Sequence, residues 1–450
     1  MKLLCISNGH GEDVIALRIL NALRQYAPEL HISALPISGT GSAYQSQNIP
    51  IVGPAKTLPS GGFLNRDPKQ LARDVQKGLL PLTRQQLQAI KKWAAETTPK
   101  DSILAVGDIV PLLFARLSKL SYHFIGTAKS EYWIRDERGK LPSSTFSDRL
   151  EGWSGSVYLP WERWLMSSDR CKSIFVRDAL TAQHLQTLGI PADYAGNPMM
   201  DNLAPTGKLT ERLNTLSSTL RPAQPPSSNT LPPDIDPAPN KATALYVTPK
   251  QQPTHPLTIV LLPGSRQPEA YENWERILTT LPSLKKSFPT RPLILLGAIA
   301  PSLSPQKLQT ALPNTWATQS TAPYPTFTHQ NITLLLINNA YSDCLHQADI
   351  AIATAGTATE QFVGLGKPAI TLPGNGPQFT PTFAKVQARM LGPAIQILTA
   401  PTETGPAIHK LINTPDRLQL IYQNGTHRMG SPDAGKRIAK KLLETMNDER

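Results

Sequence analysis

The sequence predicts an α/β protein with two halves, each built on a parallel β-sheet that helices cover on both faces. Short apolar runs alternate with helical patterns over residues 1–204, and the same alternation begins again at residue 257. Between them, residues 205–256 contain 11 prolines, many beside Ser, Thr, Gln and Asn, which is typical of a linker or surface insertion. At 450 residues the chain is also too long for one ordinary core.

The first half, residues 1–204, has a helical spacing of apolar residues over 13–26 and a second long helical pattern over 70–96. The segments between the helices are short and apolar, as expected of strands that are buried on both faces. These predicted strands are residues 2–7, 31–35, 102–106, 123–126 and 173–176.

The second half, residues 257–430, carries the same kind of strand pattern. A loop rich in Pro, Thr and Ser is expected near residues 300–330. Residues 431–450 contain a final helix that can belong to either half, including by packing back on the first. The predicted strands are residues 257–262, 293–296, 332–337, 350–353, 369–372 and 395–398.

Composition narrows the class of protein. The cysteines Cys5, Cys171 and Cys344 are scattered, so we expect neither a disulfide framework nor a zinc site. The first residues lack the apolar stretch of a signal peptide, and no apolar run approaches the roughly 20 residues that span a bilayer. A net charge of +12 favours anionic partners such as nucleotide-sugars or lipid headgroups. No nucleic-acid-binding motif is present, so we expect no nucleic-acid partner.

Two segments of the second half have the pattern of a phosphate-binding site. In the first, Gly264 permits a tight turn after a strand, and Ser265 and Arg266 provide donors for a diphosphate. The second, residues 353–361, leads from a strand into a helix, whose free N–H groups favour an anion. The candidate ligand-binding residues of this segment and of the following loop are Gly356, Thr357, Ala358, Thr359, Glu360, Gln361, Asn375 and Gln378. Among them, Glu360 or Gln361 is expected to accept hydrogen bonds from sugar hydroxyls, and the loop to close over the ligand.

The loop after the first strand offers catalytic side chains. Gly9 and Gly11 let the backbone approach a ligand, and His10 lies between them. Glu12 and Asp13 follow as carboxylates at the start of a helix, where the alternative is that they only complement the helix dipole. The spacing is not a dinucleotide fingerprint, because the GxGxxG pattern would need glycine where valine stands at position 14.

Asp108 follows the strand 102–106 and Gly107. A partly desolvated carboxylate at the end of a strand is suited to general-base catalysis, and here it could deprotonate an acceptor hydroxyl. The alternative, equally compatible with this segment, is that Asp108 caps the helix that begins near Pro111.

The order of these motifs resembles that of the lipid-A-disaccharide synthases, which are GT-B glycosyltransferases of family 19. The resemblance spans most of the chain, and its most specific part is residues 262–266, Leu-Pro-Gly-Ser-Arg. The other segments that carry it are the loop ending in Asp13, Gly107–Asp108, residues 196–201 (Gly-Asn-Pro-Met-Met-Asp) and Gly356–Ala358.

The resemblance implies two Rossmann-like domains whose parallel sheets face a central cleft. It implies an inverting transfer of an acylated or N-acetylated glucosamine from UDP, the co-substrate, to a lipid-linked or hydrophobic acceptor, at a cytoplasmic membrane face. The second domain would bind the donor, and the role of base would fall on Asp108, with His10 and Asp13 beside it. The expected acceptor contacts are Gly9, Gly11, Glu12 and Asn197. No metal or other cofactor is expected, because the helix dipole and Arg266 can take the place of a metal at the diphosphate.

The chain also departs from that family. His10 and Gly11 stand where the family has a small residue or Glu, and Gln361 aligns with its ribose-binding glutamate, one position after Glu360. The proline-rich insertion is extra. We therefore expect a divergent branch, and two alternatives stay open: a UDP-sugar epimerase or hydrolase of the same fold, and a non-catalytic sugar-nucleotide-binding protein.

Trp153, Trp161 and Trp164 lie close together in the sequence, with arginines nearby. Aromatic residues with basic neighbours are typical of the bilayer interface, so we expect this segment to meet a membrane surface. The alternative is that the tryptophans fill the core or line an acceptor pocket.

Overall fold

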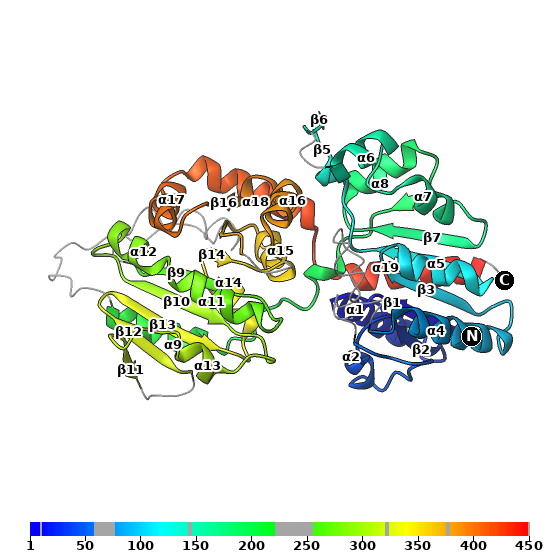
Figure 1. The fold of residues 1–450 in the computed structure, drawn as a ribbon, viewed down its shortest axis with the longest axis horizontal. Helices are drawn as coiled ribbons and strands as arrows, with labels where there is room; N and C mark the ends of the chain where they lie inside the picture. Colours follow the sequence, from blue (N-terminus) through cyan, green and yellow to red (C-terminus); the bar gives the residue numbers. More distant parts are fainter. Residues whose placement is uncertain are drawn as a thin grey trace, which may run out of the picture. The chain divides into compact units, whose positions relative to one another are not determined.

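The computed structural model describes residues 1–9, 11–57, 77–142, 146–220, 255–319, 324–374 and 379–448 (Figure 1). The chain divides into two compact units. Unit 1 is Met1–Asn202 together with Met429–Arg450, and unit 2 is Leu203–Arg428. Each unit contains a β-sheet with helices packed on it, so the predicted α/β class is confirmed.

The sheet of unit 1 has the strand order β2-β1-β3-β4-β7-β8, and all of its pairings are parallel. The chain places β2 on one side of β1 and β3 on the other, so the order reverses between β1 and β3. At such a switch point, the loops that leave the strands diverge and leave room for a ligand. The strands are β1 (Lys2–Ser7), β2 (His31–Pro36), β3 (Ser102–Gly107), β4 (Ser121–Gly126), β7 (Cys171–Val176) and β8 (Ala192–Asp193).

Helices of unit 1 pack beside one another: α4 (Leu79–Ala95) and α7 (Pro160–Met166) both contact α5 (Ile109–Ser118). The remaining elements are α1 (Gly11–Tyr26), α2 (Ser42–Gln45), α6 (Phe146–Ser154), α8 (Ala179–Thr187), η1 (Glu131–Trp133), η2 (Pro198–Met200) and the short hairpin β5 (Arg135–Asp136) and β6 (Gly139–Lys140).

The last helix, α19 (Ala434–Asp448), packs against α1 in unit 1. The carboxylate of Asp201 accepts the backbone N–H groups of Ala434 at 2.9 Å and Gly435 at 2.7 Å. Arg437 donates to the carbonyl of Ala195 at 2.7 Å. Residues 196–201, one of the segments that carry the family resemblance, therefore hold the end of the chain in place.

The sheet of unit 2 has the order β11-β12-β13-β10-β9-β14-β15-β16 and reverses between β9 and β14. It is parallel from β13 to β16, and β11 and β12 add an antiparallel edge. The strands are β9 (Leu257–Leu262), β10 (Leu293–Ala298), β11 (Ala317–Gln319), β12 (Thr326–His329), β13 (Ile332–Ile337), β14 (Ile350–Ala353), β15 (Ala369–Thr371) and β16 (Ile395–Ile397).

The prediction of a loop over residues 300–330 was wrong, because this stretch contains α13 (Pro305–Gln309), β11 and β12. Thr and Phe favour strands, and an edge position tolerates the neighbouring prolines. The other helices are α9 (Thr210–Leu220), α11 (Glu269–Leu278), α12 (Leu281–Ser287), α14 (Tyr341–Gln347), α15 (Thr357–Gly364), α16 (Pro381–Leu391), α17 (Thr404–Ile412), α18 (Pro415–Met429), η3 (Gly392–Ala394) and η4 (Pro401–Glu403). None of the helices in the described ranges is both long and apolar enough to cross a bilayer.

Candidate functional site

In unit 1, Asp108 lies where β3 meets α5, beside the switch point of the sheet. One of its carboxylate oxygens accepts the N–H of Val110 at 2.9 Å and so caps α5. The side chain of Asn8, from the loop after β1, also bonds to it. Gly107 makes this approach possible: its φ is +136°, and a Cβ there would lie 2.7 Å from Oδ1 of Asn8. Asp108 is only partly exposed, so it is both a helix cap and a carboxyl group at the strand end.

The surroundings of Asp108 favour its protonated form. Burial raises the pKa of this carboxyl group, and the hydrogen bonds from Val110 and Asn8 oppose the rise in part. Among the nearby charges, Glu162 raises its pKa and Lys129 lowers it. Lys129 and Glu162 form an ion pair at 2.6 Å, and the lysine also donates to the carbonyl of Val157 at 3.0 Å. A carboxyl group with a raised pKa beside a charged pair is typical of proton-transfer sites.

Hydrogen bonds between side chains of unit 1 hold the loop after β1 in place. Asp13, in the first turn of α1, is buried and accepts a hydrogen bond from the Ser7 hydroxyl at 2.6 Å. That hydroxyl also lies 2.6 Å from the hydroxyl of Tyr44. Gly9 has φ +119°, and a Cβ there would lie 2.1 Å from a backbone oxygen. The carboxylate of Asp13 is therefore held within unit 1.

The other predicted residues of unit 1 lie in different surroundings. Glu12 is buried in the first turn of α1, whereas Gly11 begins that helix beside open space. Asn197 is buried, and its Oδ1 accepts the N–H of Met199 at 3.0 Å, so it caps η2 in the segment that holds α19. His10 lies outside the described residues.

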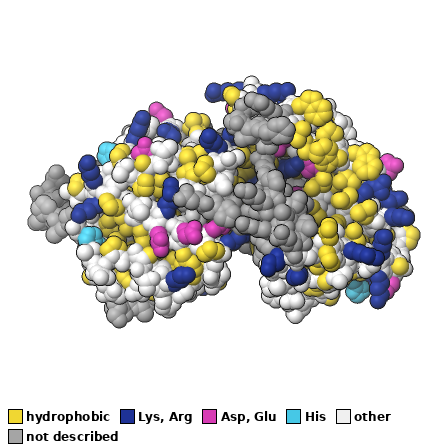
Figure 2. Space-filling view, viewed as in Figure 1, with side chains coloured by type: hydrophobic (Ala, Val, Ile, Leu, Met, Phe, Trp, Pro, Cys, Tyr) yellow, Lys and Arg dark blue, Asp and Glu magenta, His cyan; other side chains and the backbone are white. Residues whose placement is uncertain are grey.

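The three tryptophans lie at the surface rather than in the core. Their exposed fractions are 78% for Trp153, 51% for Trp161 and 65% for Trp164. The guanidinium of Arg116, on α5, lies 5.6 Å from the centre of the Trp164 ring. Figure 2 shows hydrophobic side chains gathered on this part of unit 1, with basic side chains nearby.

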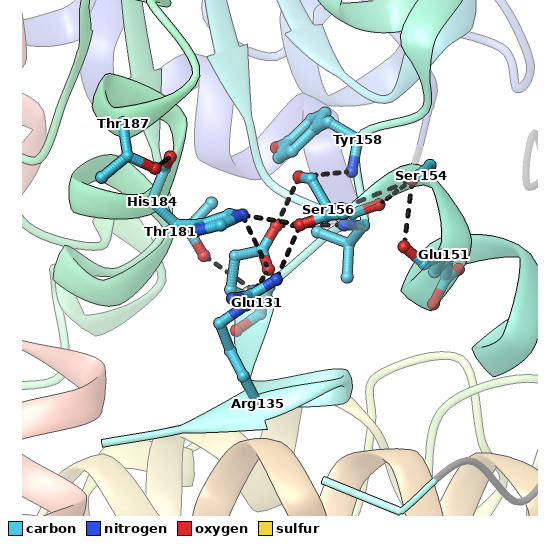
Figure 3. A network of polar contacts seen from close by, with 12 residues as sticks. Glu131, Arg135, Glu151, Ser154, Ser156, Tyr158, Thr181, His184 and Thr187 are labelled. Atoms are coloured by element: carbon cyan, nitrogen blue, oxygen red, sulfur yellow. Dashed lines mark hydrogen bonds and ion pairs between the residues drawn. The ribbon is translucent and has the colours of Figure 1, made fainter. Parts of the chain in front are cut away.

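A buried charge network that sequence reasoning missed supports the Lys129 region (Figure 3). Glu131 is fully buried, and its Oε2 pairs with Arg135 at 2.6 Å. Its Oε1 accepts the Ser156 hydroxyl at 2.5 Å and the N–H of Val157 at 3.0 Å. Arg135 also donates to the carbonyl of Gly155 at 2.6 Å. The network thereby fixes the segment that contacts Lys129. The local sequence does not predict the role of Glu131. Apart from Arg135, the partners of its carboxylate lie 25 residues or more away in the sequence.

In unit 2, the turn after β9 presents polar groups at the switch point. Gly264 has φ +96°, which favours glycine, although a Cβ there would meet no atom closer than 3.8 Å. Ser265 is exposed and Arg266 is partly exposed. The hydroxyl of Ser302 donates to the carbonyl of Ser265 at 2.9 Å, which anchors the turn from the loop after β10.

The turn after β14 leads directly into α15. Gly356, Thr357 and Ala358 are at least partly exposed, so the first N–H groups of the helix face accessible space. Thr359 is fully buried, and its hydroxyl donates to the carbonyl of Ala355 at 2.5 Å, within the same turn.

The next two predicted residues of α15 point into unit 2. Glu360 and Gln361 are both buried, and Oε1 of Gln361 accepts the hydroxyl of Tyr341 at 2.7 Å. Asn375 and Gln378 lie outside the described residues.

Asn273, on the buried side of α11, joins these two turns. Its Nδ2 donates to the carbonyl of Pro263 at 3.0 Å and to the carbonyl of Thr354 at 3.4 Å. Gln387, on α16, similarly donates to the carbonyl of Gly356 at 3.0 Å. The sequence did not point to Asn273, although a signal existed: it is a polar residue on the same buried side of the helix as Trp274 and Ile277.

The two units thus offer different chemistry. Unit 2 presents an arginine, a tight turn and a helix N-terminus, which together suit an anion such as a diphosphate. Unit 1 presents a carboxyl group with a raised pKa, which suits proton transfer. Over the described ranges, no group of three or more His, Cys, Asp or Glu side chains is arranged to hold a metal ion.

The chain matches no protein-family model and no curated protein sequence. Solved structures similar to it include MurG of Acinetobacter baumannii, with 13% identity, a TM-score of 0.54 and coverage of 98% of this chain and 99% of MurG. A calicheamicin glycosyltransferase shares 12% identity with a TM-score of 0.54, over 99% of this chain and 98% of the other. A candidate UDP-N-acetylglucosamine 2-epimerase of Listeria monocytogenes shares 12% identity with a TM-score of 0.52, over 99% of this chain and 96% of the epimerase chain.

The chain has a GT-B-like fold. Its two sheets and their connections match these structures along nearly the whole chain, so the predicted fold class is confirmed. At 12–13% identity the likeness establishes the fold alone. It neither singles out the lipid-A-disaccharide synthases nor excludes them.

We predict that Asn273→Ala loosens both turns of unit 2. The change leaves two carbonyl groups unpaired in a buried site, which costs about 1–3 kcal/mol of unfolding free energy. Amide hydrogen exchange should become faster in residues 263–266 and 354–358, and urea denaturation should show the loss of stability.

The matched control is Asn331→Ala. Asn331 bonds two carbonyls in the same way, those of Phe288 at 2.7 Å and Arg291 at 2.8 Å, before β13 begins. It should lower stability by a similar amount and leave exchange in the two turns unchanged. Equal exchange in those turns for the two variants would show that Asn273 does not hold them.

Proposed function

We propose that this protein is an inverting glycosyltransferase that moves a sugar from UDP to a lipid-linked or hydrophobic acceptor. The observation that carries the proposal is the pair of joined turns in unit 2, at the switch point of its sheet. The sugar would be of the N-acetylglucosamine or acylated glucosamine type, as the resemblance to lipid-A-disaccharide synthases implies. One structure with this fold is a calicheamicin glycosyltransferase, and another bears the name of UDP-N-acetylglucosamine, which supports a nucleotide-sugar donor.

The donor would be held by unit 2. Arg266 and Ser265 would bind the diphosphate, together with the free N–H groups at Gly356, Thr357 and Ala358. The nucleoside would lie toward Glu360 and Gln361, one of which would accept hydrogen bonds from the ribose. Asn375 and Gln378 keep their predicted role as donor contacts.

The reaction would begin when Asp108 removes the proton of an acceptor hydroxyl. The oxygen then attacks the anomeric carbon from the face opposite the diphosphate. A new carbon–oxygen bond forms as the bond from that carbon to the phosphate oxygen breaks, and UDP leaves with the bonding electrons. The configuration at the anomeric carbon is therefore inverted. Arg266 and the helix N–H groups would stabilise the charge that develops on the diphosphate.

Other residues of unit 1 would assist Asp108 at the carboxyl ends of the strands. His10 and Asp13 would act beside the base, and Gly9, Gly11, Glu12 and Asn197 would shape the acceptor site. For Asn197 this role would be indirect, because its side chain is buried and caps η2.

A UDP-sugar epimerase or hydrolase is the second candidate, and the Listeria structure of the same fold favours it. The two reactions differ in what they need, since an epimerase acts on the donor without a lipid acceptor. A non-catalytic protein that binds a sugar nucleotide is the third candidate.

We propose that the exposed tryptophans, Trp153, Trp161 and Trp164, contact a membrane surface that carries the acceptor. Amphipathic aromatic rings favour the interface of a bilayer, and Arg116 beside Trp164 would attract anionic headgroups.

For the donor site, we expect Arg266→Ala to weaken UDP binding about 30-fold, equivalent to about 2 kcal/mol for the loss of a charged hydrogen-bonding partner. Isothermal titration with UDP measures the change. Lys286→Ala is the control, because it removes one positive charge from an exposed position in α12. If the Arg266 variant binds UDP as tightly as the control does, the donor-site assignment is wrong.

For the base, we expect Asp108→Asn to lower kcat by about 10²- to 10⁴-fold. The amide can still accept the N–H of Val110, so α5 remains capped and UDP binding should not change. The assay follows UDP release from UDP-N-acetylglucosamine with a membrane lipid extract. Asp201→Asn, at another carboxylate helix cap of unit 1, should leave kcat intact.

The same assay should show a pH dependence in the unmodified protein. Because the pKa of Asp108 is raised, kcat/KM should fall as the pH drops through a value above that of an ordinary aspartate. UDP release that proceeds without any lipid would instead favour the epimerase or hydrolase.

For the membrane surface, the variant with Trp153, Trp161 and Trp164 all changed to Ala should bind liposomes containing anionic lipid about ten-fold more weakly. Cosedimentation measures this. Leu420→Ala, at an exposed leucine of α18 in unit 2, is the control and should bind as the unmodified protein does. Equal binding by the two variants would rule out this surface.

A further inference from the structure

Ser302, in the loop after β10, bonds to both neighbours of Arg266 in unit 2. Its hydroxyl donates to the carbonyl of Ser265 at 2.9 Å, and its own carbonyl accepts the side-chain amide of Gln267 at 2.5 Å. Ser265 and Gln267 flank Arg266 in the segment between β9 and α11. One residue of a different loop therefore holds the chain on either side of the predicted diphosphate-binding arginine.

Two further hydrogen bonds fix the rest of this turn. Asn273 donates to the carbonyl of Pro263 at 3.0 Å, and the N–H of Ala270 donates to the carbonyl of Arg266 at 2.8 Å. Both donors belong to α11, the helix into which the turn leads. Ser302 adds its bonds from another element, the loop that follows β10, the neighbouring strand of β9. The backbone of the turn is thus tied both to its own helix and to the adjacent loop.

The loop that carries this serine is itself anchored against α11. Leu303 is buried, and the N–H of Ser304 donates to the hydroxyl of Tyr271 at 3.0 Å. The indole N–H of Trp274, which is fully buried, donates to the carbonyl of Leu308 in α13 at 3.0 Å. The loop therefore keeps a fixed position relative to α11 and can act as a rigid brace for the turn.

The bonds of Ser302 are suited to positioning rather than to stabilising the fold. Ser302, Ser265 and Gln267 are all exposed, so water can replace either bond when it is broken. Removal of the Ser302 hydroxyl should therefore change the free energy of unfolding little. A diphosphate, in contrast, gains from a guanidinium whose backbone is already fixed, because less freedom is lost when the charge-assisted hydrogen bonds form.

We infer that Ser302 is a positioning residue for the diphosphate site, and that it acts by holding the backbone on both sides of Arg266. This inference rests on the proposed function, because it assumes that Arg266 binds the diphosphate of the donor. It adds to the donor site a loop to which the sequence did not point, the one after β10.

The test is a double-mutant cycle between Ser302 and Arg266 in the full-length protein, with the Kd for UDP measured by isothermal titration. Ser302→Ala alone should raise this Kd about five-fold. In the Arg266→Ala background the same change should raise it less than about two-fold, because no guanidinium is left to position. Ser302→Thr keeps a hydroxyl that can donate to the carbonyl of Ser265, so its Kd should stay within about two-fold of the unmodified value.

The matched control is Ser283→Ala. The hydroxyl of Ser283, on α12 of unit 2, donates to the carbonyl of Thr402 at 2.6 Å and accepts the N–H of Gly405 at 3.0 Å. Because this serine is buried, its change to alanine should lower the Tm by about 2–4 °C and leave the Kd for UDP unchanged. Ser302→Ala should show the reverse, an unchanged Tm and a higher Kd.

Three results would overturn the inference while the donor site stands. The first is a Ser302→Ala variant that binds UDP as tightly as the unmodified protein. The second is an equal loss of affinity with and without Arg266, which would mean that Ser302 does not act through the arginine. The third is a Ser283→Ala variant that binds UDP as weakly as Ser302→Ala. An unmodified protein that does not bind UDP would instead refute the proposed donor site, and the inference with it.

Discussion

Parallel pairing of the strands is the constraint on which both sites depend. A parallel sheet brings the carboxyl ends of its strands to one edge, so the loops that follow them become neighbours although they are far apart in sequence. In unit 1 this edge brings Asn8 to Asp108, and in unit 2 it brings Pro263 to Thr354. In both units the strand order reverses beside the first strand of the sheet in sequence: between β1 and β3 in unit 1, and between β9 and β14 in unit 2.

Amide side chains then hold the loops in each unit. Asn8 bonds to Asp108 across the gap that Gly107 leaves open, and Asn273 bonds to the carbonyls of two turns at once. These groups are positioned in the folded chain itself, before any ligand arrives. Polar groups that are already oriented lose little on binding and stabilise charge effectively, which is the general basis of catalysis by preorganised dipoles.

The strands, the two turns of unit 2 and the loop at Asp108 could be predicted from the sequence. Short apolar runs and glycines favour strands and turns through their own local conformation, so these elements can be recognised without knowledge of the fold. It did not reveal Asn273, the Glu131 network or the antiparallel edge of unit 2. Glu131 is stabilised by Ser156 and Val157, which approach it only when the chain has folded. Thr359 illustrates the same limit: its position in the helix start suggested a ligand contact, yet its hydroxyl bonds to the preceding turn.

The capping of α19 by Asp201 has a consequence for how the protein is made. Unit 1 is discontinuous in sequence, since Ala434 lies 233 positions after Asp201. During synthesis the whole of unit 2 is made before the helix that covers α1. Before α19 is made, the residues of α1 that pack against it stay exposed to solvent. The carboxylate of Asp201 likewise lacks the N–H groups of Ala434 and Gly435 that it accepts in the folded protein. Unit 1, which emerges first, can therefore be completed only after all of unit 2 has been synthesised.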